Sequence, residues 1–226
     1  MTGNRLVAAF LLRNEAGEDR YLRRVLTNVR EFCDHIVVVD DGSTDDTAAV
    51  CLSFGAEVNT LTGGNGVGWW GSDERSARSL LWDLAAEAAG QDGWIYFADG
   101  DHEMLPTAGI PPCSVVQQAM ASEVCTAWAV PLWDLWQPDG QGMRVDGFWQ
   151  AHLHPRPWFF KAQPYLGWTP KWGDRKDLHT GHAPVNFPLV CGLLPAAIAH
   201  WGYANPIHRD QKYAKYLAAK GAECSP

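Results

Sequence analysis

The chain has 226 residues, of which 46% are hydrophobic and 19% charged, a balance typical of a folded protein rather than a disordered one. Its formal net charge of −8 argues against a broad nucleic-acid-binding surface and leaves room only for a local basic patch. No run of about 18 apolar residues occurs, no signal-peptide pattern opens the chain, and the cysteines lack zinc spacing. We therefore expect a soluble, cytoplasmic protein with reduced cysteines.

Strand and helix patterns alternate from the start of the chain. Residues 5–12 read as a strand that is apolar after Arg5. Residues 17–33 carry apolar side chains at helical spacing, and residues 36–39 are four consecutive apolar residues. A helix to about Phe54 and a strand at 56–61 follow. This order predicts an α/β fold in which a parallel sheet is built with right-handed crossovers, and residues 36–39 are buried on both faces of it.

The second strand ends at a polar corner, Asp40-Asp41-Gly42. Ser43 or Thr44 is placed to cap the next helix, which carries two further Asp residues in its first turn. Ligands of open α/β sheets bind just beyond the carboxyl ends of the strands, so this corner is a candidate nucleotide site. The same residue types also form ordinary turns, and the pattern alone does not choose between the two readings.

The sequence Val-Val-Val-Asp-Asp-Gly-Ser-Thr-Asp-Asp-Thr at residues 37–47 resembles the nucleotide-binding segment of family 2 glycosyltransferases, which have the GT-A fold. The resemblance implies a Rossmann-like, mostly parallel central sheet flanked by helices, with an antiparallel acceptor-side extension. It implies that Asp40, beside Gly42, binds the uracil or ribose, and that Arg13, Asn14 and Glu15 lie beside the nucleotide. For Asn14 a turn residue at a helix entry is an equal alternative.

Residues 62–71 contain five glycines but follow no phosphate-loop template, so we expect a flexible loop over the sugar-nucleotide pocket. Residues 72–89 then show helical spacing and carry Arg75 and Arg78. The family commonly has an arginine here that points into the donor site. The sequence does not decide which of the two arginines fills that role, and either could be a solvated surface residue.

A second apolar strand, residues 94–98, ends at Asp99-Gly100-Asp101, about sixty residues after Asp40. Mn²⁺ and Mg²⁺ prefer carboxylate oxygens, and a sugar diphosphate needs such an ion to bridge it to an acidic protein. Family 2 enzymes carry an Asp-x-Asp motif of this kind. The resemblance therefore implies that Asp99 and Asp101 bind the metal, with Gly100 close to the donor; a turn with a helix cap is the alternative.

The following stretch resembles the acceptor side of the family only in outline. We expect a helix at 114–122, a strand at 125–132, a hairpin turn near 133–140 that returns to residue 149, and an irregular loop at 155–173. An inverting enzyme needs a carboxylate or imidazole that deprotonates the acceptor hydroxyl. Asp146 is our candidate for this base, with Asp134 and His182 as rivals.

The end of the chain carries a third motif, Ile198-Ala199-His200-Trp201-Gly202-Tyr203 at residues 198–203. It resembles the His-aromatic-Gly-Tyr ending of one branch of family 2, in which later basic residues follow. The resemblance implies that His200 completes the metal site, and that Arg209 and Lys212, on a final helix, reach the diphosphate.

These features predict one GT-A domain over 1–226, with a nucleotide-sugar half at 1–105 and an acceptor half with the closing segment at 106–226. The expected reaction is metal-dependent transfer of a sugar from a nucleotide-sugar to an acceptor hydroxyl, with inversion. The expected donor is a UDP-hexose such as UDP-glucose, and the expected cofactor is Mn²⁺ or Mg²⁺.

Several alternatives stay open. The acceptor is a saccharide, a lipid-linked sugar, a protein or a modified DNA base, and a phage-type glucosyltransferase acting on hydroxymethylated bases fits the last. A nucleotidyltransferase would be expected to show a Gly-rich signature with Lys or Arg after the first strand, which Arg13-Asn14-Glu15 does not supply. A non-catalytic sugar-binding module built on the twelve tryptophans is the third alternative.

Overall fold

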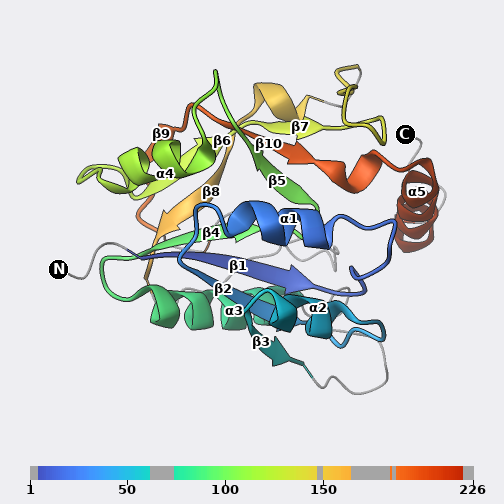
Figure 1. Cartoon of the computed structure of the whole chain (residues 1–226), viewed down its shortest axis with the longest axis horizontal. Helices are drawn as coiled ribbons and strands as arrows, with labels where there is room; N and C mark the ends of the chain where they lie inside the picture. Colours follow the sequence, from blue (N-terminus) through green and yellow to red (C-terminus); the bar gives the residue numbers. More distant parts are fainter. Residues whose placement is uncertain (1–4, 62–73, 147–149, 164–183, 185–186, 221–226) are drawn as a thin grey trace.

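The protein is built around a seven-stranded sheet and a smaller three-stranded one (Figure 1). The computed structural model describes residues 5–61, 74–146, 150–163, 184 and 187–220, the last six of these by their backbone alone. The strand order of the large sheet is β3-β2-β1-β4-β8-β6-β9. Its first four strands run parallel to one another: β1 (Leu6–Leu12), β2 (His35–Asp40), β3 (Glu57–Thr60) and β4 (Trp94–Ala98).

The second half of the chain completes the same sheet. Strand β8 (Arg156–Lys161) runs antiparallel to both β4 and β6 (Ala127–Val130), and β9 (Cys191–Leu193) runs parallel to β6. The predicted α/β class, with a mostly parallel sheet and an antiparallel extension, is confirmed.

Helices cover both faces of the large sheet because its central strands are apolar on both sides. In β1, Ala8 and Phe10 face a cluster that includes α1 (Leu22–Val29), α2 (Thr47–Ser53) and α4 (Pro112–Met120). Val7 and Ala9 face the opposite cluster with α3 (Glu74–Ala89). Residues 37–39 of β2 are fully buried, as expected.

The small sheet lies on the far side of α1 from β1 (Figure 1). Its central strand β10 (Ala197–His200) pairs antiparallel with β5 (His102–Leu105) and parallel with β7 (Leu132–Asp134). The chain then passes through a short 3₁₀ turn, η2 (Trp201–Tyr203), into the last helix α5 (Pro206–Lys220); another such turn, η1 (Ala151–Leu153), precedes β8. In Figure 1, α5 stands beside the end of the molecule to which β1 points.

Some sequence-based expectations were wrong in detail. Residues 156–161 are strand β8 rather than irregular loop, because they pair with β4 and β6 and bury Trp158 and Phe159 in one core cluster and Phe160 in the other. The residues after Asp101 form β5, so the alternative of a turn with a helix cap does not hold there. Helix α2 has no cap from Ser43 or Thr44; Asp45 Oδ1 instead accepts the backbone N–H of Thr47 at 3.0 Å.

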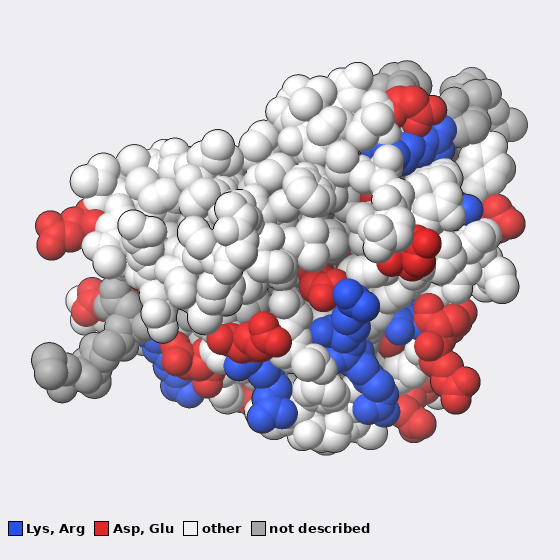
Figure 2. Space-filling view, turned by 45° about the horizontal axis from the view of Figure 1, so that its top comes forward, with Lys and Arg blue, Asp and Glu red and all other residues white. Residues whose placement is uncertain are grey.

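Charged side chains are unevenly distributed over the face shown in Figure 2. Lys, Arg, Asp and Glu gather in its lower part, and a broad uncharged area covers most of its upper part. The sequence agrees, since residues 104–143 contain neither Lys nor Arg. Among the helices that the structure describes, none combines the length and the apolar character needed to cross a membrane.

Candidate active site

Three neighbouring parallel strands end side by side, and the loops that follow them surround a cavity of about 470 Å³. These loops follow β1, β2 and β4. Residues from β10, η2 and α5 close the cavity from the other side, so that distant parts of the chain meet at it. The lining consists of Leu11, Leu12, Arg13, Asn14, Glu15, Arg20, Asp41, Arg78, Asp99, Gly100, Asp101, His200, Tyr203, His208, Gln211 and Lys212. The cavity therefore lies where ligands bind in open α/β sheets.

Asn14 fastens the loop after β1 to the loop after β2. Its backbone, at φ 53°, donates an N–H to Ser43 Oγ at 3.0 Å, and its Oδ1 accepts the N–H of Thr44 at 2.8 Å. The next N–H, that of Glu15, is donated to Thr47 Oγ1 at 2.8 Å. Asn14 is thus a cross-link that shapes the cavity wall, and it also lines the cavity.

The two carboxylates after β2 face different ways. Asp40 is buried and accepts hydrogen bonds from the backbone N–H and the hydroxyl of Ser43, so it stabilises the turn at Gly42, whose φ is +69°. Asp41 is also buried but lines the cavity, with Arg13 Nη1 at 3.7 Å from its Oδ2. Asp41, which the sequence did not single out, is therefore the carboxylate of this pair that a ligand would meet.

The structure separates the two arginines of α3. Arg75 is exposed and does not line the cavity, whereas Arg78 does. Arg78 is held by the buried Glu74, with 2.5 Å between Nε and Oε1, and its Nη2 lies 3.9 Å from Asp99 Oδ1. This geometry aims the Arg78 guanidinium at the Asp-x-Asp motif.

Asp99 and Asp101 both line the cavity, and positive groups surround both. Burial alone would raise the pKa of Asp101, but Lys212 and His200 hold it well below its usual value. For Asp99, burial is likewise outweighed by His102 and Arg78, so its pKa is lowered. The motif is thus a pair of ionised carboxylates, as cation binding requires.

The small sheet delivers two histidines and a carboxylate to this motif. In its register His200 lies opposite His102 on one side and Asp134 on the other. His200 Nδ1 lies 2.7 Å from Asp134 Oδ1, and its Nε2 lies 3.4 Å from Asp101 Oδ2. Burial alone would lower the pKa of His200, but Asp101 and Asp134 raise it to about 9 in the metal-free protein.

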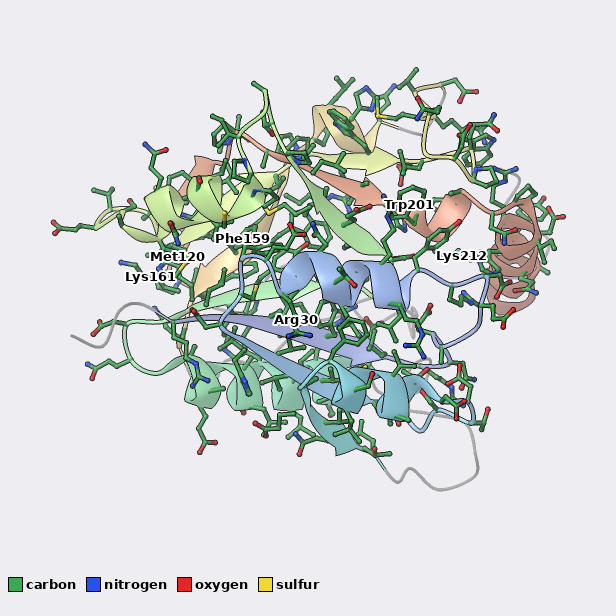
Figure 3. The ribbon with its side chains drawn as sticks, viewed as in Figure 1. Arg30, Met120, Phe159, Lys161, Trp201 and Lys212 are labelled. Atoms are coloured by element: carbon green, nitrogen blue, oxygen red, sulfur yellow. The ribbon has the colours of Figure 1, made fainter. Side chains whose placement is uncertain are left out.

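Potential ligand atoms of Asp101, His102 and His200 lie within 4.8 Å of one another. The backbone leaves space beside them at Gly202, where a Cβ atom would lie 2.7 Å from His200 Nε2 and closer still to Asp101 Oδ2 and Lys212 Nζ. Lys212 Nζ approaches Asp101 Oδ2 to 3.4 Å from α5, on the same side of the molecule as Trp201 (Figure 3).

Glu15 differs from the other carboxylates of the cavity. Burial raises its pKa to about 7, and the nearby charge of Asp101 adds to the effect, while Arg20 and Lys212 oppose it. Arg20 Nη1 lies 3.8 Å from Glu15 Oε2. Glu15 therefore changes charge near neutral pH.

Other candidate residues lie away from the cavity. Arg209 donates from Nη1 to the backbone oxygens of Trp136 and Tyr203 at 2.7 and 2.9 Å, so it fixes the chain around η2. Asp146 is exposed and ion-paired with Arg144 at 2.6 Å. His182 and the Gly-rich stretch lie outside the described residues.

The family comparison covers this same cavity. The model of Glycosyl transferase family 2 matches residues 12–114. Over these residues the chain resembles family 2 glycosyltransferases. The match contains every loop after β1, β2 and β4, so the predicted family is confirmed where the donor motifs lie. The His-Trp-Gly-Tyr motif lies beyond the matched residues, and the branch of the family stays a prediction. No curated protein matches the chain.

Solved structures match part of the chain. S. aureus TarS matches with a TM-score of 0.43 and 16% identity, over 63% of this chain and 23% of that one. Glucosyl-3-phosphoglycerate synthase from Mycobacterium tuberculosis, in complex with Mn²⁺ and UDP-glucose, matches with a TM-score of 0.38 and 20% identity, over 58% and 44%. The chain thus spans less than half the length of either structure. At this level of similarity their substrates are no guide to its own.

Proposed function

We propose that the chain is a metal-dependent glycosyltransferase that transfers a hexose from a UDP-sugar to an acceptor hydroxyl with inversion. The observation that carries this proposal is the convergence of Asp99, Asp101, His200 and Lys212 on one cavity at the carboxyl ends of the parallel strands. An acidic pair opposite a lysine is suited to a ligand that is itself anionic but arrives with a cation. The family 2 match over this segment supports the assignment.

The residues present fit a divalent cation. Asp99 and Asp101 are ionised, His200 is oriented by Asp134, and Gly202 leaves room beside them. We propose that Asp99, Asp101 and His200 hold Mn²⁺ or Mg²⁺, which when bound would offset the charge of the leaving diphosphate. Lys212 and Arg78 add positive charge from the protein's own side chains.

We propose that the neighbouring carboxylates Asp40 and Asp41 have different roles in nucleoside binding. Asp40, the residue that the family resemblance points to, holds the turn through Ser43, and Asp41 with Arg13 lines the cavity. The uracil or ribose would therefore meet Asp41, on a wall that Asn14 and Asp40 keep in shape. Arg209 supports the same closure through backbone oxygens rather than through the diphosphate.

The sequence offers Asp146, Asp134 and His182 as candidates for the general base. Asp146 is our sequence-based candidate, but the hydrogen bond from Arg144 lowers its pKa, which favours a stable carboxylate over a proton acceptor. Asp134 is engaged by His200.

We also propose that residues 1–226 form one GT-A domain with a donor half at 1–105 and an acceptor half at 106–226. The support is that β6, β8 and β9 of the second half extend the same sheet as β1 to β4. The division is one of role rather than of folding unit.

The alternatives find less support. Large tryptophan side chains such as Trp82, Trp94 and Trp158 are buried in the core, so they form no sugar-binding surface. Residues 104–143, in the half that we propose binds the acceptor, contain neither Lys nor Arg, so phosphate contacts to DNA would need cations from elsewhere in the chain. The acceptor otherwise stays open among saccharides, lipid-linked sugars and proteins.

Calorimetric titration with UDP, GDP and UDP-hexoses, each with and without Mn²⁺, tests the proposal. We expect binding of UDP compounds that depends on the ion and is lost in Asp101→Ala, in a variant that keeps its melting temperature to within a few degrees. Ion-independent binding, or binding that survives in Asp101→Ala, would contradict metal-dependent donor recognition.

A further inference from the structure

The two histidines at the Asp-x-Asp motif have opposite hydrogen-bonding environments. His200 Nδ1 faces a carboxylate, Asp134 Oδ1, at 2.7 Å. His102 Nδ1 faces a donor instead, since the backbone N–H of Asp99 points at it from 3.3 Å. A carboxylate only accepts and a backbone N–H only donates, so these contacts fix which nitrogen of each neutral ring carries its proton.

For His200, the consequence is that one ring nitrogen is available to bind a metal ion. Its Nδ1 donates to Asp134, which leaves the lone pair of Nε2 directed at the cluster, 3.4 Å from Asp101 Oδ2. Metal-binding histidines usually donate their other N–H to a carboxylate or carbonyl in this way. Asp134, which the sequence offered only as a rival base, thus orients the ring of His200.

For His102, the consequence is that the nitrogen facing the motif carries a proton. With Nδ1 accepting, the proton sits on Nε2, and this Nε2–H lies 3.8 Å from Asp99 Oδ2 and 3.8 Å from Asp101 Oδ1. It faces both carboxylates of the motif and has no lone pair to offer an ion. A small rotation of either carboxylate would bring it to the distance of about 2.9 Å that a direct hydrogen bond requires.

The His102 ring is also held rigidly in this position. It is 2% exposed, its edge packs against Trp158 at 4.8 Å between centroids, and its other neighbour is the ring of His200 at 5.1 Å. It belongs to β5, opposite His200 in the register of the small sheet. A donor fixed between two like charges would keep Asp99 and Asp101 at the separation that one ion needs.

We infer that His102 is a positioning residue and not a metal ligand: its Nε2–H holds Asp99 and Asp101 together as a cation site, while His200 supplies the imidazole ligand. The inference rests on the proposed function, because it gives the cluster a cation to hold. It goes beyond that function by assigning opposite roles to two histidines that both lie within 4 Å of a carboxylate of the motif.

Two variants separate the roles. His102→Gln keeps an amide N–H near the position of Nε2, whereas His102→Asn can still accept the N–H of Asp99 but does not reach the carboxylates. We expect His102→Gln to keep the Mn²⁺ affinity of the wild type within about threefold and His102→Asn to lose 10- to 100-fold, the usual cost of an outer-shell partner. The exposed His154 provides the matched control, His154→Gln, with unchanged affinity. Equal losses in both His102 variants, or no loss in either, would overturn the inference.

Spectroscopy of the full chain provides readouts that do not depend on turnover. Long-range ¹H–¹⁵N spectra should show His102 as the Nε2–H tautomer, with and without Mg²⁺, and His102→Gln assigns the signal. Pulsed EPR of the Mn²⁺-loaded protein should show one imidazole nitrogen that disappears in His200→Ala and persists in His102→Gln.

The outcomes separate the inference from the proposed function. An Nδ1–H tautomer for His102, or two imidazole nitrogens on the ion, would overturn the positioning role while leaving metal dependence intact. A wild-type protein that binds no Mn²⁺ would contradict the proposed metal dependence, and the role of His102 with it. Because the tautomer is measured on the wild type, the test holds even where His102→Asn fails to fold.

Discussion

Replacing Gly202 with alanine adds one methyl group at the centre of the proposed cation site. Its Cβ would lie 2.7 Å from His200 Nε2, whereas ordinary contacts of a Cβ begin at 3.4 Å, so the ring must retreat by at least 0.7 Å. Asp101 Oδ2 and Lys212 Nζ are closer still and must move further. A misplacement of this size at a reacting centre typically costs about 100-fold, so we expect Mn²⁺ affinity to fall 10- to 100-fold and transfer by about 100-fold.

The measurement is Mn²⁺ binding by EPR, together with UDP-sugar hydrolysis or transfer and a thermal melt. Gly142→Ala is the matched control, since its added methyl meets only the side chain of Gln137 and the position has no left-handed φ. We expect this control to bind Mn²⁺ like the wild type. If Gly202→Ala folds normally and keeps both affinity and activity, then Asp101, His200 and Lys212 do not form the cation and diphosphate site, and the reasoning is refuted.

Three further predictions follow from neighbouring side chains. Arg78→Ala should weaken UDP binding by about 1.5–3 kcal/mol, because charged hydrogen bonds from its guanidinium are lost. Replacement of the exposed Arg75 by alanine should change the UDP affinity by less than twofold. Equal effects of the two variants in calorimetry would contradict the assignment of Arg78. The pKa of Glu15 is raised from 4.5 to about 7, so between these pH values the folded metal-free protein holds a proton that the unfolded chain releases. The free energy of unfolding should therefore fall by at most about 3 kcal/mol as the pH rises from 4.5 to 7. Denaturant titrations of Glu15→Gln should lack this part of the pH dependence, and a profile identical to that of the wild type would count against the assignment. Asp146→Asn should change the transfer rate by less than about threefold, because its carboxylate is exposed and paired with Arg144; a loss of 100-fold or more, with donor binding intact, would restore Asp146 as the general base.

The donor half of the molecule could be predicted because its signals are local. Apolar runs such as residues 36–39 and 94–98 predict buried parallel strands, and the polar residues after them must meet at one edge of the sheet. Even there, which neighbour faces the cavity was beyond the sequence. Asp40 and Asp41 are both buried, and only the hydrogen bonds from Ser43 show that Asp40 is turned away.

The acceptor half was harder to predict because its strands are short and their partners are distant. Strand β8 contains a proline and lies between β4 and β6, and its aromatic residues resemble those of an irregular loop when the partners are unknown. The role of Asp134 likewise depends on a register between β7 and β10, 66 residues apart. The sequence holds no local trace of such a pairing.

The small sheet explains how the proposed metal site can be assembled from such distant residues. Asp101 precedes β5, Asp134 ends β7 and His200 ends β10. Pairing of β10 with both β5 and β7 therefore brings all three residues to one edge of the small sheet. The backbone N–H of Trp201 donates to the carbonyl of Asp101 at 2.9 Å and stabilises this edge. Helix α5 follows directly and adds Lys212. The site therefore depends on the pairing of β10, and any change that loosens this strand should weaken metal binding before it weakens the large sheet, whose strands pair independently of it.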